Sequence, residues 1–200
     1  GIIGAVNTLK IDNKGKIKGY NTDVYGFLSA LDNIETYKDK VAGIIGNGGA
    51  SRAVIYALIT SGFQNINIYA RDPVKSEELI KFAGKVSCDA KIKHLELIEN
   101  VELRDLYLLV NTTPLGMYGK FEEISPVSLA SLETMPANST VYDIVYKPKL
   151  TKMLEYSEIC GLKTIEGLEM LVLQGAKSFE IWTGQKAPVD VMRQIAMENL

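Results

Sequence analysis

The chain is poor in the residues that bind transition metals. It contains one histidine, His94, and two cysteines, Cys88 and Cys160, whose separation does not fit a zinc motif. No metal site is therefore predicted. Both cysteines are interpreted as small buried hydrophobic residues of a protein in a reducing compartment. His94 follows a lysine-rich stretch, so we expect it at the surface without a catalytic role.

Long hydrophobic runs and an excess of positive charge are also missing. No apolar run approaches the roughly 18 residues of a membrane-spanning helix, and no signal-peptide pattern is present. The formal net charge is −2 at pH 7, whereas nonspecific nucleic-acid binding requires a basic surface. We therefore expect a cytoplasmic protein that binds neither nucleic acid nor membranes. An apolar fraction of 46% is ample for a sizeable core.

The strongest local pattern begins at Val41 with the sequence VAGIIGNGGASRAVIYAL. A short apolar run precedes Gly46, Asn47, Gly48, Gly49, Ala50 and Ser51, and apolar residues then recur at helical spacing. Strand, glycine turn and helix in this order are typical of the first unit of a dinucleotide-binding fold. Gly46 permits a tight turn, Gly48 leaves room for a pyrophosphate, and the helix N-terminus attracts negative charge. Because Ser51 replaces the third glycine of the motif, an ordinary strand-to-helix turn also fits this pattern.

Strands and helices are predicted to alternate from Val41 to about Ile165. This alternation is typical of an α/β fold, a Rossmann-like doubly wound parallel sheet with helices on both faces. The expected elements include strands at 66–70, 86–92, 106–110, 140–145 and 164–165, a helix ending near Gly84, and short helices at 95–101 and 126–132. A hairpin before this region and two helices after it do not fit the alternation.

The outer segments are interpreted as a second, incomplete lobe, to which the long helix from Leu168 returns. The chain begins without methionine, so we expect it to be part of a longer protein.

The end of the second strand carries mixed charge. It reads Ala70, Arg71, Asp72, Pro73, Val74, Lys75. An arginine at this position accommodates the 2′-phosphate of NADP, whereas an acidic residue binds the 2′-OH of NAD. Asp72 could serve a 2′-OH or repel a phosphate, and a solvated turn with Pro73 in the first turn of a helix fits as well. NADP is favoured over NAD.

Three further polar segments have more than one interpretation. A helix is predicted from about Thr22 to Asn33, and Asn21, Thr22 or Asp23 can cap it. The sequence after the apolar strand 106–110, NTTPLGM, should face the cofactor, although a simple connection fits equally. Gln174 lies on the edge of a long helix, where such a residue is usually solvated.

Six ordered segments together resemble shikimate dehydrogenases over nearly the whole chain. They are Gly4–Thr8 (GAVNT), Gly19–Asp23 (GYNTD), Gly46–Arg52 (GNGGASR), Asn111–Met117 (NTTPLGM), Tyr142–Pro148 (YDIVYKP) and Gly167–Gln174 (GLEMLVLQ). The resemblance implies NADPH-dependent, reversible reduction of 3-dehydroshikimate to shikimate in aromatic amino-acid biosynthesis, by a monomer or homodimer. It implies that residues 1–21 are a remnant of an N-terminal substrate-binding domain, residues 22–166 an NADP-binding Rossmann domain, and residues 167–200 C-terminal helices that return to the substrate lobe. It implies substrate contacts from Asn7, Asp23, Tyr146 and Gln174. It implies cofactor contacts from Gly46, Asn47, Gly48, Gly49, Ala50, Ala70, Arg71, Asp72, Lys75, Ile144 and Gly167.

The resemblance also implies a catalytic pair of a lysine and an aspartate. Asp23 matches the aspartate, which would orient the lysine and bind a substrate hydroxyl. A negative neighbour favours the ammonium form of the lysine, which can then steady alkoxide charge. The family's lysine lies before the segment that Gly4–Thr8 matches, so these 200 residues alone are expected to bind NADPH without oxidising shikimate.

Two departures from the family keep alternatives open. The family usually has Asn-Arg-Thr or Asn-Arg-Ser where this chain has Ala70, Arg71 and Asp72, so a quinate/shikimate dehydrogenase that uses NAD or NADP is an alternative. Asn47 replaces the usual alanine, which is harmless if its side chain points away from the pyrophosphate. A non-catalytic nucleotide-binding sensor is a further alternative, but a sensor would not need the polar set Asn7, Asp23 and Gln174.

Overall fold

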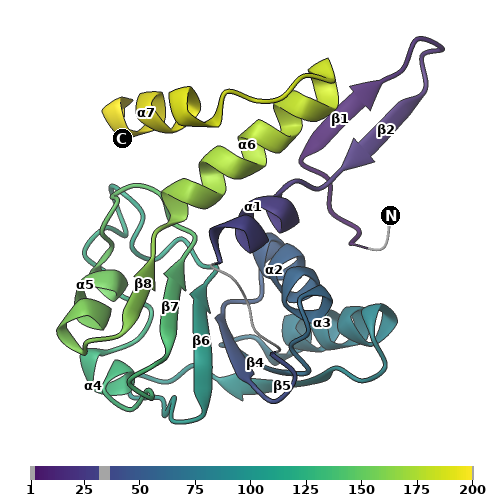
Figure 1. Cartoon of the computed structure of the whole chain (residues 1–200). Coiled ribbons are helices and arrows are strands. Elements are labelled where there is room, and N and C mark those ends of the chain that lie inside the picture. The colour runs from purple at the N-terminus through teal and green to yellow at the C-terminus, as the bar shows by residue number, and fades with distance from the viewer. Residues whose placement is uncertain (1–2, 32–36, 200) are drawn as a thin grey trace.

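A six-stranded parallel sheet forms the centre of the protein, whose structure is a computed structural model that describes residues 3–31 and 37–199 (Figure 1). The strands are β3 (Val41–Ile45), β4 (Asn65–Ala70), β5 (Lys91–Glu96), β6 (Leu106–Asn111), β7 (Thr140–Asp143) and β8 (Lys163–Ile165). Their spatial order is β5-β4-β3-β6-β7-β8, and every neighbouring pair is parallel. This order is that of the Rossmann fold, so the predicted fold class is confirmed.

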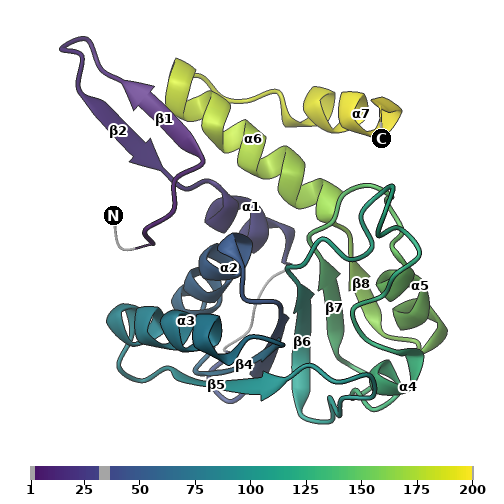
Figure 2. The same cartoon turned by 180° about the vertical axis from the view of Figure 1, so that it is seen from behind.

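Helices cover both faces of the sheet (Figures 1 and 2). They are α2 (Gly49–Thr60) and α3 (Pro73–Val86) on one face, and α4 (Leu129–Leu132) and α5 (Lys152–Ile159) on the other. Successive strand residues point to opposite faces, so Ile44 belongs to the first buried cluster and Ile45 to the second. The central strands are therefore apolar on both sides, as their sequence predicts.

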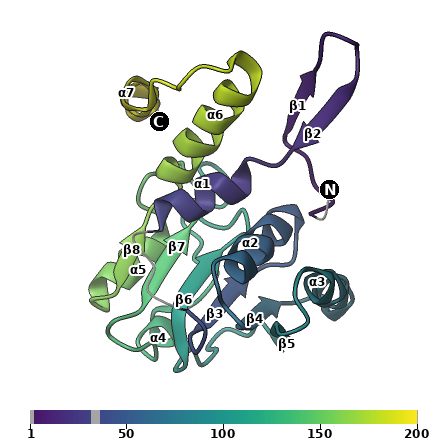
Figure 3. The same ribbon diagram turned by 45° about the vertical axis from the view of Figure 1, so that its right-hand side comes forward.

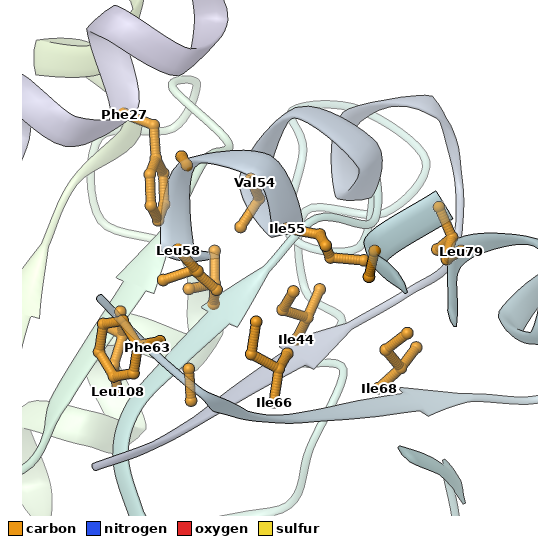
Figure 4. Close-up of a cluster of buried hydrophobic side chains, with 14 of the residues drawn as sticks. Phe27, Ile44, Val54, Ile55, Leu58, Phe63, Ile66, Ile68, Leu79 and Leu108 are labelled. Atoms are coloured by element: carbon orange, nitrogen blue, oxygen red, sulfur yellow. The ribbon is translucent and has the colours of Figure 1, made fainter. Parts of the chain in front are cut away.

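The first cluster fixes the glycine turn in space. Val54, Ile55 and Leu58 of α2 project onto Ile44 and the isoleucines of β4 (Figure 4). All three side chains are essentially inaccessible to solvent. Burying a side chain of this size stabilises the fold by about 1.5–3 kcal/mol. The packing of α2 on the sheet thus holds its N-terminus at the carboxyl end of β3.

The remaining elements lie at or beyond the carboxyl edge of the sheet (Figure 3), and Phe27 and Met170 from two of their helices join the first buried cluster. They are the hairpin of β1 (Thr8–Ile11) and β2 (Ile17–Tyr20), and the helices α1 (Asp23–Ala30), α6 (Gly167–Thr183) and α7 (Val189–Asn199). Helix α1 packs against α6, and the indole N–H of Trp182 donates to the carbonyl of Leu9 at 2.8 Å. The predicted hairpin and the two C-terminal helices are confirmed, and they are joined to one another.

The predictions between Gly84 and Val101 are partly wrong. Helix α3 continues through Gly84 to Val86, β5 begins at Lys91, and 97–101 contains no helix. Strand β5 is at the edge of the sheet, so its lysines face solvent and the sequence lacks the apolar run of a central strand. Within the described residues α1 ends at Ala30, and Asn33, the predicted end of that helix, lies outside them.

The cysteines also differ from the prediction. Cys88 is exposed, because it lies in the turn that leads from α3 to the edge strand β5. Cys160 is half-buried at the end of α5. Residues 3–31 and 37–199 include no helix that is both long and apolar enough to cross a membrane.

The contact between α1 and α6 requires glycine at position 26. A Cβ on Gly26 would lie 2.7 Å from the carbonyl oxygen of Met170 and 3.0 Å from the backbone nitrogen of Gln174. We expect Gly26→Ala to lower the free energy of unfolding by about 1–3 kcal/mol, because the helices must move apart. Urea denaturation measures this. Gly84→Ala is the control, since open space surrounds that helical position, and it should be neutral or stabilising. Equal stability of the Gly26→Ala protein and the wild type would contradict the close contact.

Candidate active site

Two clefts open at the carboxyl edge of the sheet. The first has a volume of about 410 Å³ and is lined by Gly46, Asn47, Gly48, Tyr69, Ala70, Arg71, Asp72, Lys75, Leu97, Thr112, Thr113, Pro114, Leu115 and Phe121. The second has a volume of about 250 Å³ and is lined by Asn7, Asp23, Ile144, Tyr146, Gly167, Met170, Leu171 and Gln174. The two linings include every residue predicted for the site except Gly49 and Ala50, which begin helix α2.

The glycine turn is shaped for an anionic group. Gly46 has a φ of +101°, and a Cβ there would lie 2.8 Å from the side chain of Thr113. Gly48 and Gly49, by contrast, face open space. Gly48 is the N-cap of α2 and offers no side chain to its first N–H groups. These N–H groups and the positive end of the helix dipole suit the pyrophosphate of a dinucleotide.

Ser51 closes this turn in place of the third glycine of the motif. Its side chain is buried, and its hydroxyl donates to the carbonyl of Gly46 at 3.1 Å. It also lies 2.8 Å from the hydroxyl of Thr112, which donates to the carbonyl of Ile45. Ser51 therefore closes the turn through its bond to Gly46, and the bond from Thr112 to Ile45 joins the ends of β3 and β6.

Asp72 is the N-cap of α3. Its carboxylate accepts from the backbone N–H groups of Val74 at 3.0 Å and Lys75 at 3.3 Å. The Lys75 ammonium lies 3.8 Å from the same carboxylate. Pro73 occupies the first turn, as the interpretation of this segment as a helix start requires. The charge of Asp72 is thus stabilised by the start of helix α3 and by Lys75. Arg71 is exposed beside Asp72 at the cleft.

Asn7 organises the polar side of the second cleft. Its amide nitrogen donates to the Asp23 carboxylate at 2.8 Å and to the Thr22 hydroxyl at 3.0 Å. Its oxygen accepts from the backbone N–H of Thr22 at 2.9 Å. One side chain thus connects the segment before β1 with the start of α1 and fixes the carboxylate of Asp23.

Three buried hydroxyl groups extend this network to α6. Ser178 lies 2.7 Å from the hydroxyl of Thr8 and 3.1 Å from that of Thr22, and all three residues are buried. The Thr22 hydroxyl also lies within 3.3 Å of the Gln174 side-chain oxygen. The sequence analysis assigned no role to Thr8 or Ser178. Ser178 follows Gln174 by one helical turn, and that spacing is the signal that could have found it.

Asp23 does not cap its helix. The backbone N–H of Val24 is bound by Asn21 at 3.3 Å. Within the described part of the chain, the Asp23 carboxylate accepts one hydrogen bond, from Asn7. Burial raises the pKa of Asp23, and the hydrogen bond from Asn7 acts in the opposite sense. The carboxylate is thus held at the second cleft, where it can bind a ligand.

Comparison with known proteins decides the family. The sequence model of the shikimate 5′-dehydrogenase C-terminal domain matches residues 167–197. The NADP-dependent shikimate dehydrogenase of Methanopyrus kandleri is 43% identical over 204 residues, which cover all of this chain and 69% of that relative. The chain belongs to the shikimate dehydrogenase family.

Solved structures agree with this membership. A shikimate dehydrogenase in complex with NADP+ matches with a TM-score of 0.86 and 36% identity, covering 99% of this chain and 68% of its own. The ligand-free 5-ketofructose reductase of a Gluconobacter strain matches with a TM-score of 0.88 and 31% identity, covering 100% of this chain and 70% of its own. The sheet and both clefts therefore belong to a fold that shikimate dehydrogenases share with another reductase.

Asp143 connects two loops at the carboxyl edge in this member of the shikimate dehydrogenase family. It lies at the end of β7 and is fully buried. Its carboxyl group accepts from the Thr151 hydroxyl at 2.7 Å, the backbone N–H of Val145 at 3.0 Å and the Asn111 amide at 3.0 Å. Asn111 in turn donates to the carbonyl of Leu115. Asp143 thereby holds the loop after β6 against the segment that leads to Tyr146.

The environment of Asp143 predicts a pH-dependent stability. Burial raises the pKa of Asp143 from 3.8 to about 6, although its three hydrogen bonds act in the opposite sense. The carboxyl is neutral in both states below its unfolded pKa. As pH rises toward about 6, the unfolded state ionises first, so the stabilising contribution is lost. Above pH 6 the native state carries a buried carboxylate.

We expect Asp143→Asn to remove this dependence. The amide nitrogen can donate to the Thr151 hydroxyl as the protonated carboxyl can, and it does not ionise. Urea unfolding from pH 4 to pH 7.5 should show wild-type stability falling relative to the variant by at most about 1.4 kcal/mol per pH unit up to pH 6. Asp39→Asn, at an exposed position, should keep the wild-type profile. Parallel profiles for Asp143→Asn and wild type would mean that this carboxyl titrates in its ordinary range.

Proposed function

We propose that this chain supplies the NADP-binding groups and part of the substrate site for the reversible reduction of 3-dehydroshikimate to shikimate. One observation carries the proposal. The second cleft gathers Asn7, Asp23, Tyr146 and Gln174 from four separate segments, beside Ile144 and Gly167. The family membership and the relative's NADP complex support the same activity. Cytoplasmic location and a monomeric or homodimeric state are parts of this proposal.

The first cleft fits a dinucleotide phosphate. Open space surrounds Gly48 and Gly49, and a side chain at either position would occupy part of it. The N–H groups at the start of α2 face this space. Arg71 and Lys75 lie along the same cleft and match the charge of a 2′-phosphate. Bound NADPH supplies the hydride. The nicotinamide would lie toward Ile144 and Gly167, where the lining of the second cleft begins.

The second cleft fits a ring that carries hydroxyl groups. Asp23 can accept from a hydroxyl, and Gln174 offers an amide on the facing helix α6. The ketone carbon gains the hydride and its oxygen gains a proton, so the ketone is reduced while the nicotinamide is oxidised. Asp23 would orient an ammonium group that delivers this proton, as the family resemblance implies. Residues 22–166 form most of the cofactor site, and residues 1–21 and 167–200 belong mainly to the substrate side, to which Asp23 and Tyr146 also contribute.

Asp23→Asn tests the catalytic assignment in the full-length protein. Turnover of shikimate should fall by about 100-fold or more, because a neutral amide cannot stabilise the proton-delivering ammonium group. The dissociation constant of NADPH should stay within about twofold, since Asp23 lies in the other cleft.

The matched control is Asp89→Asn, at an exposed acid between α3 and β5, which should keep wild-type turnover. Quinate is assayed in parallel, so that preference for quinate would redirect the proposal to that substrate. Unchanged shikimate turnover in the Asp23→Asn protein would rule out the catalytic role.

Arg71→Ala tests the cofactor assignment. The affinity for NADPH should fall by about tenfold or more, because a charge-assisted hydrogen bond to the 2′-phosphate is lost. The affinity for NADH should change by less than about twofold. Fluorescence titration of both reduced cofactors measures this, with Arg104→Ala as the control, since Arg104 is exposed and pairs with Glu102 outside the cleft. Equal losses for the two cofactors, or tighter wild-type binding of NADH, would favour the NAD alternative.

A further inference from the structure

The side chain of Asn47 connects the glycine turn to helix α3. Its amide nitrogen donates to the backbone carbonyl of Asp72 at 2.6 Å and to the hydroxyl of Ser76 at 3.0 Å. A carbonyl oxygen only accepts, so this contact fixes which end of the amide is the nitrogen. The turn that faces a pyrophosphate and the loop that carries Arg71 are therefore joined by a side chain that the family's usual alanine would lack.

Ser76 is the centre of this connection. It is fully buried, and its hydroxyl oxygen has three polar neighbours. They are the Asn47 amide at 3.0 Å, the Asp72 carbonyl at 3.2 Å and the Nδ1 atom of His94 at 3.0 Å. No other polar pairing of this hydroxyl occurs among the described residues.

The hydrogen count at Ser76 assigns the proton of His94. A hydroxyl has one hydrogen to donate and two lone pairs that accept. The Asn47 amide can only donate, and the hydroxyl donates its single hydrogen to the Asp72 carbonyl four residues before it, as a serine within a helix commonly does. The second lone pair of Ser76 must then accept from His94, and Nδ1 of His94 carries a hydrogen. The only histidine of the chain thus has a defined partner beneath the cofactor cleft.

We propose that Asn47, Ser76 and His94 form a positioning chain that sets the loop of Arg71 and Lys75 at the distance from the glycine turn that NADPH requires. This inference rests on the proposed cofactor binding. NADPH must satisfy two anionic groups at once, its pyrophosphate and its 2′-phosphate. Asn47 lies at the glycine turn and bonds to Asp72 of the loop of Arg71, and both segments line the first cleft. NADH lacks the 2′-phosphate, so a shift of this loop costs it less.

The positioning chain also acts on the charge of the loop. The backbone carbonyl of Asp72 accepts hydrogen bonds from Asn47 and Ser76, while its carboxylate caps the first turn of α3. The carboxylate is thereby kept on the N–H groups of Val74 and Lys75. Loss of the chain would free this negative charge close to Arg71, which again opposes a 2′-phosphate more than a 2′-hydroxyl.

The test compares NADPH and NADH binding in Asn47→Ala, Ser76→Ala and His94→Phe. We expect the dissociation constant of NADPH to rise about five- to tenfold in the first two variants, and that of NADH less than about twofold. The double variant Asn47→Ala/Ser76→Ala should lose no more than the worse single variant, because both changes break one connection. Ser157→Ala is the matched control, since Ser157 is a buried helical serine that donates to the carbonyl four residues before it, as Ser76 does.

A second readout needs no cofactor. Nitrogen-15 NMR of the single histidine should show hydrogen on Nδ1 in the wild type and a shift toward the Nε2–H form in Ser76→Ala. Equal losses of NADPH and NADH affinity, unchanged affinities, or an Nε2–H histidine in the wild type would each overturn the positioning chain. Binding of NADPH by the wild type tests the proposed function separately. A wild-type protein that binds neither NADPH nor NADH would contradict the proposed function, whatever the variants show.

Discussion

All six strands of the sheet run parallel, so their carboxyl ends share one edge. Between β3 and β6 the chain turns to opposite sides of the sheet, which leaves a crevice at that edge. The loops at this edge contain buried polar groups of the backbone and side chains. Because water cannot reach these groups, they need hydrogen-bond partners within the protein. Ser51, Thr112, Asn111 and Asp143 are buried at this edge and bonded to the loops. The same constraint therefore produces both the crevice and its rigid walls.

The sequence predicted the fold wherever local pattern and tertiary environment agree. Strand β3 is apolar because both of its faces are covered, and Gly46 marks a turn that needs positive φ. Strand β5 was misplaced because an edge strand needs no apolar run, and its lysines resemble a loop. The local pattern alone offered Asp23 as a possible cap and Gln174 as a solvated residue, and only the family resemblance assigned them to the substrate. Their contacts connect residues separated by up to 152 positions, which no local pattern can show.

The mixed charge after β4 has a structural explanation. The carboxylate of Asp72 accepts hydrogen bonds from the first N–H groups of α3, where the helix dipole also favours negative charge. Its pair with Lys75 is exposed and therefore weak, so Lys75 can turn toward a phosphate at little cost. In this departure from the family's Asn-Arg-Thr pattern, Asp72 caps helix α3, and Arg71 is exposed at the first cleft. This arrangement is the reason why we expect Arg71 to favour NADP.

Strand β7 contacts elements beside both clefts. Phe27 of α1 stacks on Tyr142 of β7 with ring centroids 4.9 Å apart, and Asp143 follows Tyr142 directly. Helix α1, which carries Asp23, is therefore fixed against β7. The next residue of that strand, Asp143, positions the loops around Ile144. A hydride can only pass between reacting atoms held about 3–3.5 Å apart. Because residues beside both clefts contact this one strand, we expect a change in β7 to alter the spacing between the two clefts.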